Sequence, residues 1–326
     1  ESAYFAGANR NKRSVTLNLS DPEGQALARR LLADSDILVE NFKTGTLEKY
    51  GLGYEQLKAE FPKLIYCSIT GFGHTGPYAA RPGYDALVQA MGGVMSLTGD
   101  PAGEPMKIGV SIADLMSGMY AGVSILAAVN HQRNTGKGQH IDISMLDTHV
   151  AWLANQGMNY LATGEIPERL GNNHPNIVPY QVMPSADGYF VLSVGNDPTF
   201  ERFCEVAGCQ NLLEDARFNK AVERVRNRDH VTETLNEITR QHPSAWWLEA
   251  LEKAKIGCGP INNLAEVFDD PQVKSRDMVI EMDHPATGSK KAKLIASPIK
   301  MSETPAEYRL APPLLGQHTD EVLQEK

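Results

Sequence analysis

A strand-like segment followed by a helix begins the folded part of the chain, in the stretch SVTLNLSDPEGQALARRLLA at residues 14–33. Residues Ser14–Leu19 are rich in β-formers. Ser20 and Glu23 then have the spacing of a capping box, with a proline between them in the first helical turn. An amphipathic helix is therefore predicted through Ala33, which makes one β-α unit.

The same order of strand and helix repeats along the first half of the chain. A short apolar strand is predicted at Ile37–Val39, a broken helix at Leu47–Phe61 and a second strand at Leu64–Ile69. Such alternation is typical of a doubly wound parallel sheet. The expected fold class is therefore α/β, with a large Rossmann-like domain.

A long apolar run follows at Leu115–Val129, inside a helix that is predicted to begin near Ser111. The run has about fifteen residues, whereas a membrane span needs about 20. We interpret it as a buried helix and expect no membrane partner. From about Gly164 prolines punctuate the chain and charged helices follow, which indicates a smaller second domain.

Composition excludes several classes of protein. The 326 residues are 42% hydrophobic and 22% charged, as in an ordinary globular protein. A net charge of −9 opposes broad binding to nucleic acid or to anionic lipid. Four cysteines without CxxC spacing indicate reduced thiols rather than a zinc site, so we expect a cytoplasmic protein, or a mitochondrial matrix protein in a eukaryote.

The tempting nucleotide motif is GFGHTG at Gly71–Gly76, a literal GxGxxG directly after a predicted strand. That motif should begin a helix, but Pro77 and Pro82 follow it. We interpret it instead as a loop whose backbone can approach a ligand closely. No metal-ligand cluster is present, and of the histidines only His74 and His174, both in loops, are kept as candidates.

Two aspartates carry the clearest chemical signal. Asp114 lies three residues after Ser111, and Asp147 three residues after Ser144, each at the start of a helix. Both fit an acidic capping box. Each also fits a carboxylate nucleophile at a helix N-terminus, and spacing alone does not choose between them.

Basic side chains gather near the start of a chain that is acidic overall. They form either a phosphate-binding edge at strand ends or a solvated basic face. The residues are Arg10, Lys12, Arg13, Lys43 and Lys49.

Together these segments resemble the class III CoA-transferases, the family that also contains carnitine-CoA transferase, formyl-CoA transferase and α-methylacyl-CoA racemase. The resemblance covers nearly the whole chain, in the family's order. The matching stretches are Asn9–Ser14, Val39–Phe42, Ile69–Gly73, Pro82–Asp85, Ala113–Asp114, Thr135–Gln139 and Leu315–Thr319.

The resemblance implies that Asp114 is the nucleophile and leaves Asp147 as a helix cap. In the racemase branch a histidine lies thirty residues before that aspartate, and here the position holds Tyr84. A tyrosine, with an ordinary pKa near 10, is a poor base for an α-proton. This favours a transferase, in which Tyr84 would hydrogen-bond a thioester or a carboxylate, over a racemase or epimerase.

The implied mechanism passes through a mixed anhydride and an aspartyl-CoA thioester, with CoA as substrate and no permanently bound cofactor or metal. By family position Asn41, Phe42 and Lys49 line the CoA site, with Lys12 and Arg13 near it.

Closer similarity points to the branch that uses dicarboxylates, such as succinyl-CoA-dependent hydroxymethylglutarate or glutarate transferases. It rests on Tyr66–Thr70, Ile177–Gln181, Gly259–Asn263 and Pro312–Thr319. A dicarboxylate acceptor needs a cation for its far carboxylate. Arg81 or Arg169 are the candidates, with His174 as a further substrate contact.

The resemblance also implies an open-ring subunit in an interlocked homodimer, and an N-terminal β-α-β segment that is expected to be missing before Glu1. The expected domains are a large one at 1–165 and 281–326 and a smaller α+β one at 184–265, with linkers at 166–183 and 266–280. A CoA-binding scaffold without catalysis remains an alternative from another class.

Overall fold

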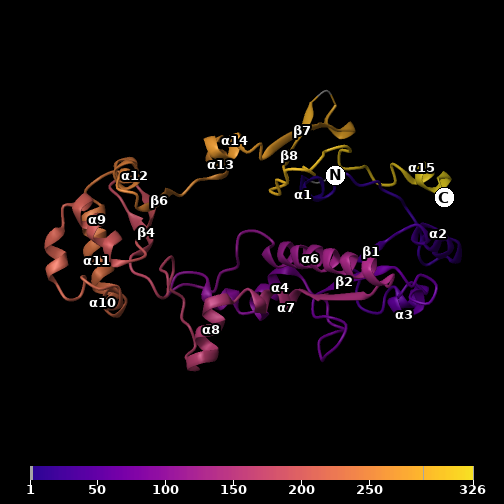
Figure 1. The fold of residues 1–326 in the computed structure, drawn as a ribbon, viewed down its shortest axis with the longest axis horizontal. Helices are drawn as coiled ribbons and strands as arrows, with labels where there is room; N and C mark the ends of the chain where they lie inside the picture. The colour runs from indigo at the N-terminus through magenta and orange to yellow at the C-terminus, as the bar shows by residue number, and fades with distance from the viewer. Residues whose placement is uncertain (1–2, 289, 326) are drawn as a thin grey trace. The chain divides into compact units, whose positions relative to one another are not determined.

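The computed structural model describes residues 3–288 and 290–325, and the chain forms two compact units (Figure 1). The first contains the chain up to Gly92, then Val110–Trp152 and the chain from Leu264 onward. The second contains Gly93–Gly109 and Leu153–Asn263. The domain ranges expected from the sequence stay a prediction.

The first unit is built on a parallel sheet of three strands in the order β1-β2-β3. These strands are β1 (Ile37–Glu40), β2 (Ile65–Thr70) and β3 (His140–Ser144). Cys67 lies opposite Val39 on one side and Ile141 on the other. The α/β class and the parallel sheet are therefore confirmed.

The other elements of this unit are short, apart from two helices. They are α1 (Ala3–Ala8), α2 (Pro22–Ala33), η1 (Glu48–Tyr50), α3 (Tyr54–Leu57), α4 (Asp85–Met91), α6 (Ile112–Thr135), α7 (Met145–Ala151), α13 (Leu264–Asp269), α14 (Pro271–Ser275), β7 (Val279–Asp283), η3 (Pro285–Thr287), β8 (Lys291–Ile295) and α15 (Thr319–Gln324).

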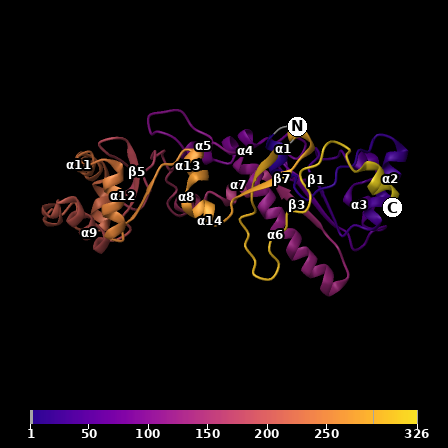
Figure 2. The ribbon, with the colours of Figure 1, turned by 90° about the horizontal axis from the view of Figure 1, so that it is seen from above.

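The sheet carries α6 on one face. Cys67 and Ile143 point to that face and pack against Ala121 and Ile125 of the helix. At the start of α6, Ala113 packs with Val88 of α4 and Met145 of α7. Figures 1 and 2 both show α4 and α7 beside α6, so three helices meet where α6 begins.

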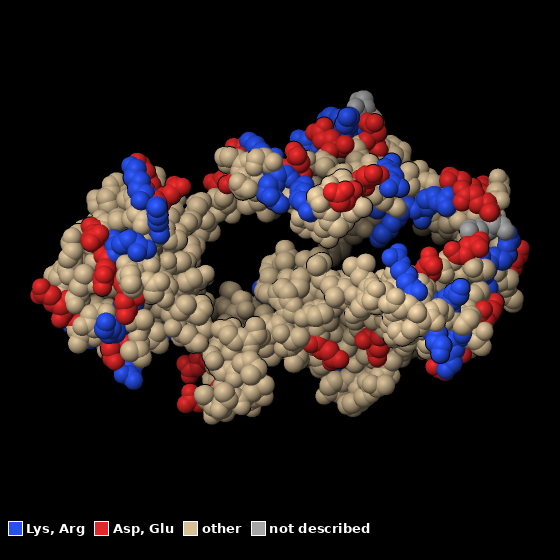
Figure 3. Space-filling view, viewed as in Figure 1, with Lys and Arg blue, Asp and Glu red and all other residues tan. Residues whose placement is uncertain are grey.

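The prediction that the long apolar helix is buried was wrong for most of its surface. Its buried residues are small and recur along one side, namely Ala113, Ser117, Ala121 and Ala128. Small side chains let the helix lie close to the sheet, while Leu115, Met119, Val123 and Leu126 on other sides are each more than half exposed. The surface over α6 in Figure 3 carries little charge. Among the described helices, only α6 is long and apolar enough to cross a membrane.

The prediction of a strand at Ser14–Leu19 was also wrong. This segment is irregular, and its backbone binds the C-terminal part of the chain instead of a sheet edge. The Ser14 carbonyl accepts from the His318 amide at 3.0 Å, and the Thr16 amide donates to Thr319 Oγ1 at 3.1 Å. The helix that follows is capped by Asp21, whose carboxylate accepts from the Glu23 amide, rather than by Ser20.

The second unit contains an antiparallel sheet, β4-β5-β6, and a core around Phe190, Phe203 and Trp247. Its elements are α5 (Val94–Leu97), α8 (Ala154–Thr163), β4 (Tyr180–Pro184), β5 (Tyr189–Ser193), α9 (Asp197–Ala207), η2 (Gln210–Glu214), α10 (Ala221–Arg226), α11 (Arg228–Thr239), α12 (Ser244–Lys253) and β6 (Gly257–Pro260).

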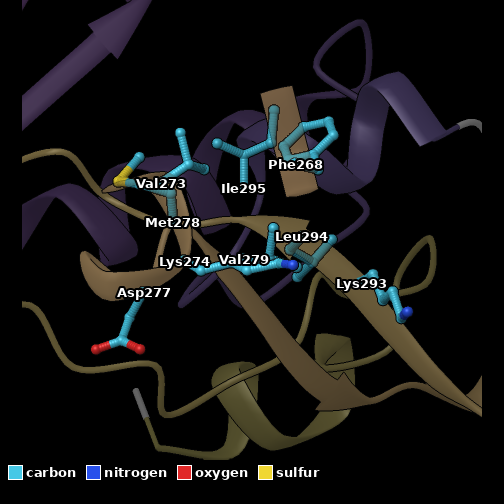
Figure 4. Close-up of a pocket in the computed structure, with 9 residues that line it drawn as sticks. All are labelled: Phe268, Val273, Lys274, Asp277, Met278, Val279, Lys293, Leu294 and Ile295. Carbon is cyan, nitrogen blue, oxygen red and sulfur yellow. The ribbon is translucent and has the colours of Figure 1, made fainter. Parts of the chain in front are cut away.

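Two of the cavities formed by the described residues of the first unit share no lining residue. One, of about 520 Å³, is mostly apolar and lies between α13–α14 and the β7–β8 hairpin, with Phe268, Met278 and Ile295 on its wall (Figure 4). The other lies at the end of the parallel sheet, and Arg81, Tyr84 and Asp114 are among the residues that line it.

Candidate active site

The second cavity has a volume of about 480 Å³ and lies at the carboxyl ends of the parallel strands. Its wall includes Asn41–Thr44 after β1, Thr70 and Gly71 at the end of β2, and Met145 directly after β3. The first turn of α6 and the loop before α4 complete it. In open α/β sheets this edge is the usual place for a ligand, because the loops there spread apart.

Asp114 is the third residue of α6 and lines this cavity. Its carboxylate makes no hydrogen bond or ion pair within the described residues, and the Ser111 side chain does not cap the helix. The capping box expected as one reading of Asp114 is therefore absent. Partial burial raises the pKa of Asp114, and the nearby Asp85 carboxylate raises it further.

Asp147, the alternative nucleophile, lies in a different arrangement. Its amide donates to Ser144 Oγ at 3.1 Å, so Ser144 caps α7 as the sequence indicated. Asp147 is not among the residues that line the cavity. Its position therefore fits a residue in a capped first turn rather than a nucleophile.

Arg81 and Tyr84 enter the cavity from the loop before α4. The Arg81 guanidinium lies 4.6 Å from the centre of the Tyr78 ring and 5.9 Å from that of Phe72. In the described part of the chain it forms no ion pair, so its charge is available to an anion. Tyr84 is 72% exposed and precedes the first residue of α4.

Two glycines give this loop its path. An added Cβ on Gly71 would lie 2.4 Å from the Gly83 Cα, and one on Gly83 would lie 2.2 Å from the Gly71 Cα. The backbone can cross here only because neither residue has a side chain. The glycine motif thus lets two loop backbones approach each other and brings Arg81 and Tyr84 to the end of β2.

Of the predicted CoA-binding residues, Asn41 and Phe42 line the cavity, together with Lys43. Lys49 lies in η1 and is not part of the wall. Lys43 belongs to the basic cluster predicted from the sequence, but the family resemblance assigned Lys49, and not Lys43, to the CoA site. A role for Lys49 stays a prediction.

The two basic residues of the N-terminal segment lie outside this wall. Arg13 pairs with Glu321 at 3.0 Å and with Glu325 at 2.8 Å. Lys12 donates to Asn9 Oδ1 at 3.1 Å. Their part in CoA binding also stays a prediction, and for Arg13 it would require exchange of carboxylate partners for phosphate.

Arg169 and His174 belong to the second unit. Arg169 donates to the carbonyls of Asp100 at 3.1 Å and Gly103 at 2.8 Å, and so fastens a loop. His174 accepts from the Asn176 amide at Nδ1. Neither lines the Asp114 cavity, and their contact with substrate stays a prediction.

His74 remains in the first unit but outside the cavity wall. Its amide donates to Asp142, and its ring packs edge-on against His140. Residues 3–288 and 290–325 contain no group of three or more side chains suited to a metal ion. Asp114 and Arg81 line the same cavity, and neither forms an ion pair with the described residues.

A carboxylate at a helix N-terminus, in a cavity at the end of a parallel sheet, is an arrangement suited to acyl transfer. The sequence profile of CoA-transferase family III matches residues 1–319. This chain belongs to that family and is a class III CoA-transferase.

Relatives and solved structures agree with this assignment. The chain is 46% identical over 323 residues to the succinate–glutarate CoA-transferase of Agrobacterium fabrum (strain C58), covering 99% of this chain and 80% of that protein. It is 38% identical to the human succinyl-CoA:glutarate CoA-transferase, covering 100% of this chain and 74% of that one. A crystal structure of a CAIB/BAIF family protein from Brucella suis superposes with a TM-score of 0.87 at 46% identity, covering 100% and 84% of the two chains.

The raised pKa of Asp114 can be measured without substrate. A carboxyl ¹³C titration by NMR, with Asp114→Asn to assign the resonance, should give a midpoint above the ordinary aspartate value of about 3.9. The charged or titratable groups around it on the cavity wall are Lys43, Arg81, Tyr84 and Asp85. A midpoint at or below the ordinary value would contradict the arrangement, and Asp147→Asn, which removes another first-turn aspartate, should leave the midpoint unchanged.

Proposed function

We propose that this enzyme transfers CoA from succinyl-CoA to a second dicarboxylic acid through a covalent aspartyl-CoA thioester on Asp114. The observation that carries the proposal is the free Asp114 carboxylate in one cavity with the free Arg81 cation. The names of the similar transferases from Agrobacterium fabrum and human, both of which pair succinate or succinyl-CoA with glutarate, support this substrate class.

The first half of the reaction releases the donor acid. An Asp114 carboxylate oxygen attacks the thioester carbonyl of succinyl-CoA, and the carbon–sulfur bond breaks to leave CoA thiolate and a mixed anhydride. The thiolate then attacks the Asp114 carbonyl carbon of the anhydride. Succinate leaves, and Asp114 holds CoA as a thioester.

The second half repeats these steps with the acceptor. Its carboxylate attacks the Asp114 thioester carbonyl, which releases thiolate and forms a second anhydride. The thiolate attacks the acceptor's acyl carbon, so that acceptor-CoA forms and the Asp114 carboxylate is free again. No proton or electron is gained or lost overall.

The cavity offers hydrogen-bond donors for the oxyanions that form during the reaction, and a cation for the substrate's second carboxylate. Tyr84 and backbone amides of the glycine-containing loops are donors for the oxyanion of each addition step. Arg81 is suited to the far carboxylate of donor and acceptor, while Asn41, Phe42 and Lys43 offer contacts to CoA.

Hydroxylamine trapping tests the covalent step. With succinyl-CoA and hydroxylamine, the enzyme should be converted to a hydroxamate, and peptide mass mapping should place it on Asp114 because an activated acyl group forms there. Asp147→Asn should be trapped at the same residue. A hydroxamate on Asp147, or none at all, would refute the mechanism. Solvent deuterium entering the α-carbon without an acceptor acid would instead identify a racemase or epimerase.

Arg81 should decide the preference for dicarboxylates. Arg81→Met removes the charge but keeps an unbranched apolar stem, and it should raise the KM for glutarate about 10- to 100-fold, as expected for a lost charge-assisted hydrogen bond. The KM for pentanoate, which has no far carboxylate, should change little. If Arg169→Met produces the loss and Arg81→Met does not, the cation is Arg169.

We further propose that two copies assemble as an interlocked homodimer, as the family resemblance implies. The exposed apolar side chains of α6 support a protein partner for this helix, since a soluble monomer rarely leaves such a stripe uncovered.

Light scattering checks the assembly. The measured mass should be twice 35.7 kDa. Leu126→Glu, in the α6 stripe, should weaken self-association because it places a charge on the apolar face. The matched Val222→Glu, at an exposed apolar residue of α10, should not weaken it. A wild-type mass of one chain at all concentrations would refute the dimer.

A further inference from the structure

The start of α6 is bound by a carboxylate from another helix. Asp85, the first residue of α4, accepts the Ala113 amide at 2.9 Å through Oδ1. Its Oδ2 accepts from Gln89 Nε2 at 2.8 Å. Ala113 and Gln89 are both fully buried, so each oxygen of Asp85 has a donor in a fixed place.

The carbonyl side of Ala113 is held as well. Ser117 Oγ donates to the Ala113 carbonyl at 2.7 Å and lies 3.0 Å from Thr148 Oγ1 of α7. Thr148 in turn donates to the Met145 carbonyl. Side chains of α4 and α6 thus bind both the amide and the carbonyl of Ala113, the residue directly before Asp114.

This arrangement removes one backbone donor that would otherwise attract an aspartate in the first turn of a helix. The first amides of a helix lack partners inside the helix, and a carboxylate in that turn is attracted to them. If Asp114 accepted the Ala113 amide, that hydrogen bond would stabilise its negative charge and make the carboxylate a weaker nucleophile. Ser111, at the N-cap, does not prevent this, because its side chain makes no capping bond.

We propose that Asp85 is a positioning residue: it occupies the Ala113 amide in place of Asp114 and so leaves the Asp114 carboxylate free to attack the thioester. This inference rests on the proposed function, since it assigns Asp85 a part in the reaction of Asp114. Asp85 does not touch the reacting atoms; it acts through the backbone of α6.

Asp85 also favours the reactivity of Asp114 through its negative charge. Its negative charge contributes to the raised pKa of Asp114, after the larger contribution of burial. A carboxylate that holds its proton more tightly is also the more reactive nucleophile once ionised. Asp85 therefore keeps Asp114 both unbound and basic.

Two substitutions of Asp85 separate the effect of its acceptor oxygen from the effect of its negative charge. Asp85→Ala should slow formation of the aspartyl-CoA thioester about 10- to 100-fold, the cost expected for a misplaced reacting group, with little change in the KM for succinyl-CoA. Asp85→Asn keeps an oxygen for the Ala113 amide and should lose less. The matched control is Asp21→Ala, which removes the cap of α2 away from the cavity and should react at the wild-type rate.

The Asp114 titration provides a readout that a purely structural role would not move. The midpoint should fall in Asp85→Asn, because a negative charge is removed. In Asp85→Ala it should fall further, because Asp114 then binds the vacated amide. Thermal unfolding would show whether Asp85→Ala folds. If it does not, the Asp114 midpoint and the rate of thioester formation in Asp85→Asn test the role of Asp85.

The outcomes distinguish this inference from the function on which it rests. A hydroxamate that forms on Asp114 in Asp85→Ala as fast as in the wild type, or an Asp114 midpoint that is unchanged in Asp85→Asn, would overturn the role of Asp85 alone. A wild-type enzyme that forms no hydroxamate on Asp114 would overturn the transfer mechanism itself.

Discussion

The hydrogen bond from the Ala113 amide to the Asp85 carboxylate is the contact on which the rest of the site depends. It joins α6, which carries Asp114, to α4, which follows the loop of Arg81 and Tyr84. Because Ala113 also packs against Val88 and Met145, the contact is both polar and part of the core. The contact therefore joins the two segments of the chain that bring Asp114 and Arg81 to the cavity.

Helix α6 has two distinct surfaces, one packed on the sheet and one exposed. Its small buried residues bring α6 close to the sheet, and its first turn reaches the carboxyl ends of the strands for that reason. Its large apolar residues remain on the surface of the chain. Large side chains on the inner face would push α6 away from β2 and move Asp114 with it. The small apolar residues of the helix therefore face the sheet, and the large ones lie on the other sides.

Much of the local structure could be predicted because local signals determine it. The helix start at Pro22 and the strands near Ile37 and Ile65 follow from residues typical of a helix N-terminus and from hydrophobic periodicity. The strand expected at 14–19 failed because its β-rich composition reports a preference for extended backbone, and that backbone is bound by the residues around His318, about three hundred positions away. The burial of α6 was misjudged for a related reason, since apolarity does not say which side has a partner.

The sequence by itself determined the α/β class, the family resemblance and Asp114 as the leading candidate, since these depend on residue types in a fixed order. Spacing left Asp114 and Asp147 equivalent and the family resemblance favoured Asp114. The fold shows how their surroundings differ: Ser144 caps the helix of Asp147, while Asp85 supplies the cap that Ser111 does not provide for α6. The sequence likewise indicated a basic cluster but not that Lys43 rather than Lys49 lines the cavity. These distinctions depend on contacts between residues distant in sequence, and such contacts are decided by the packing of helices on the sheet, which no local pattern encodes.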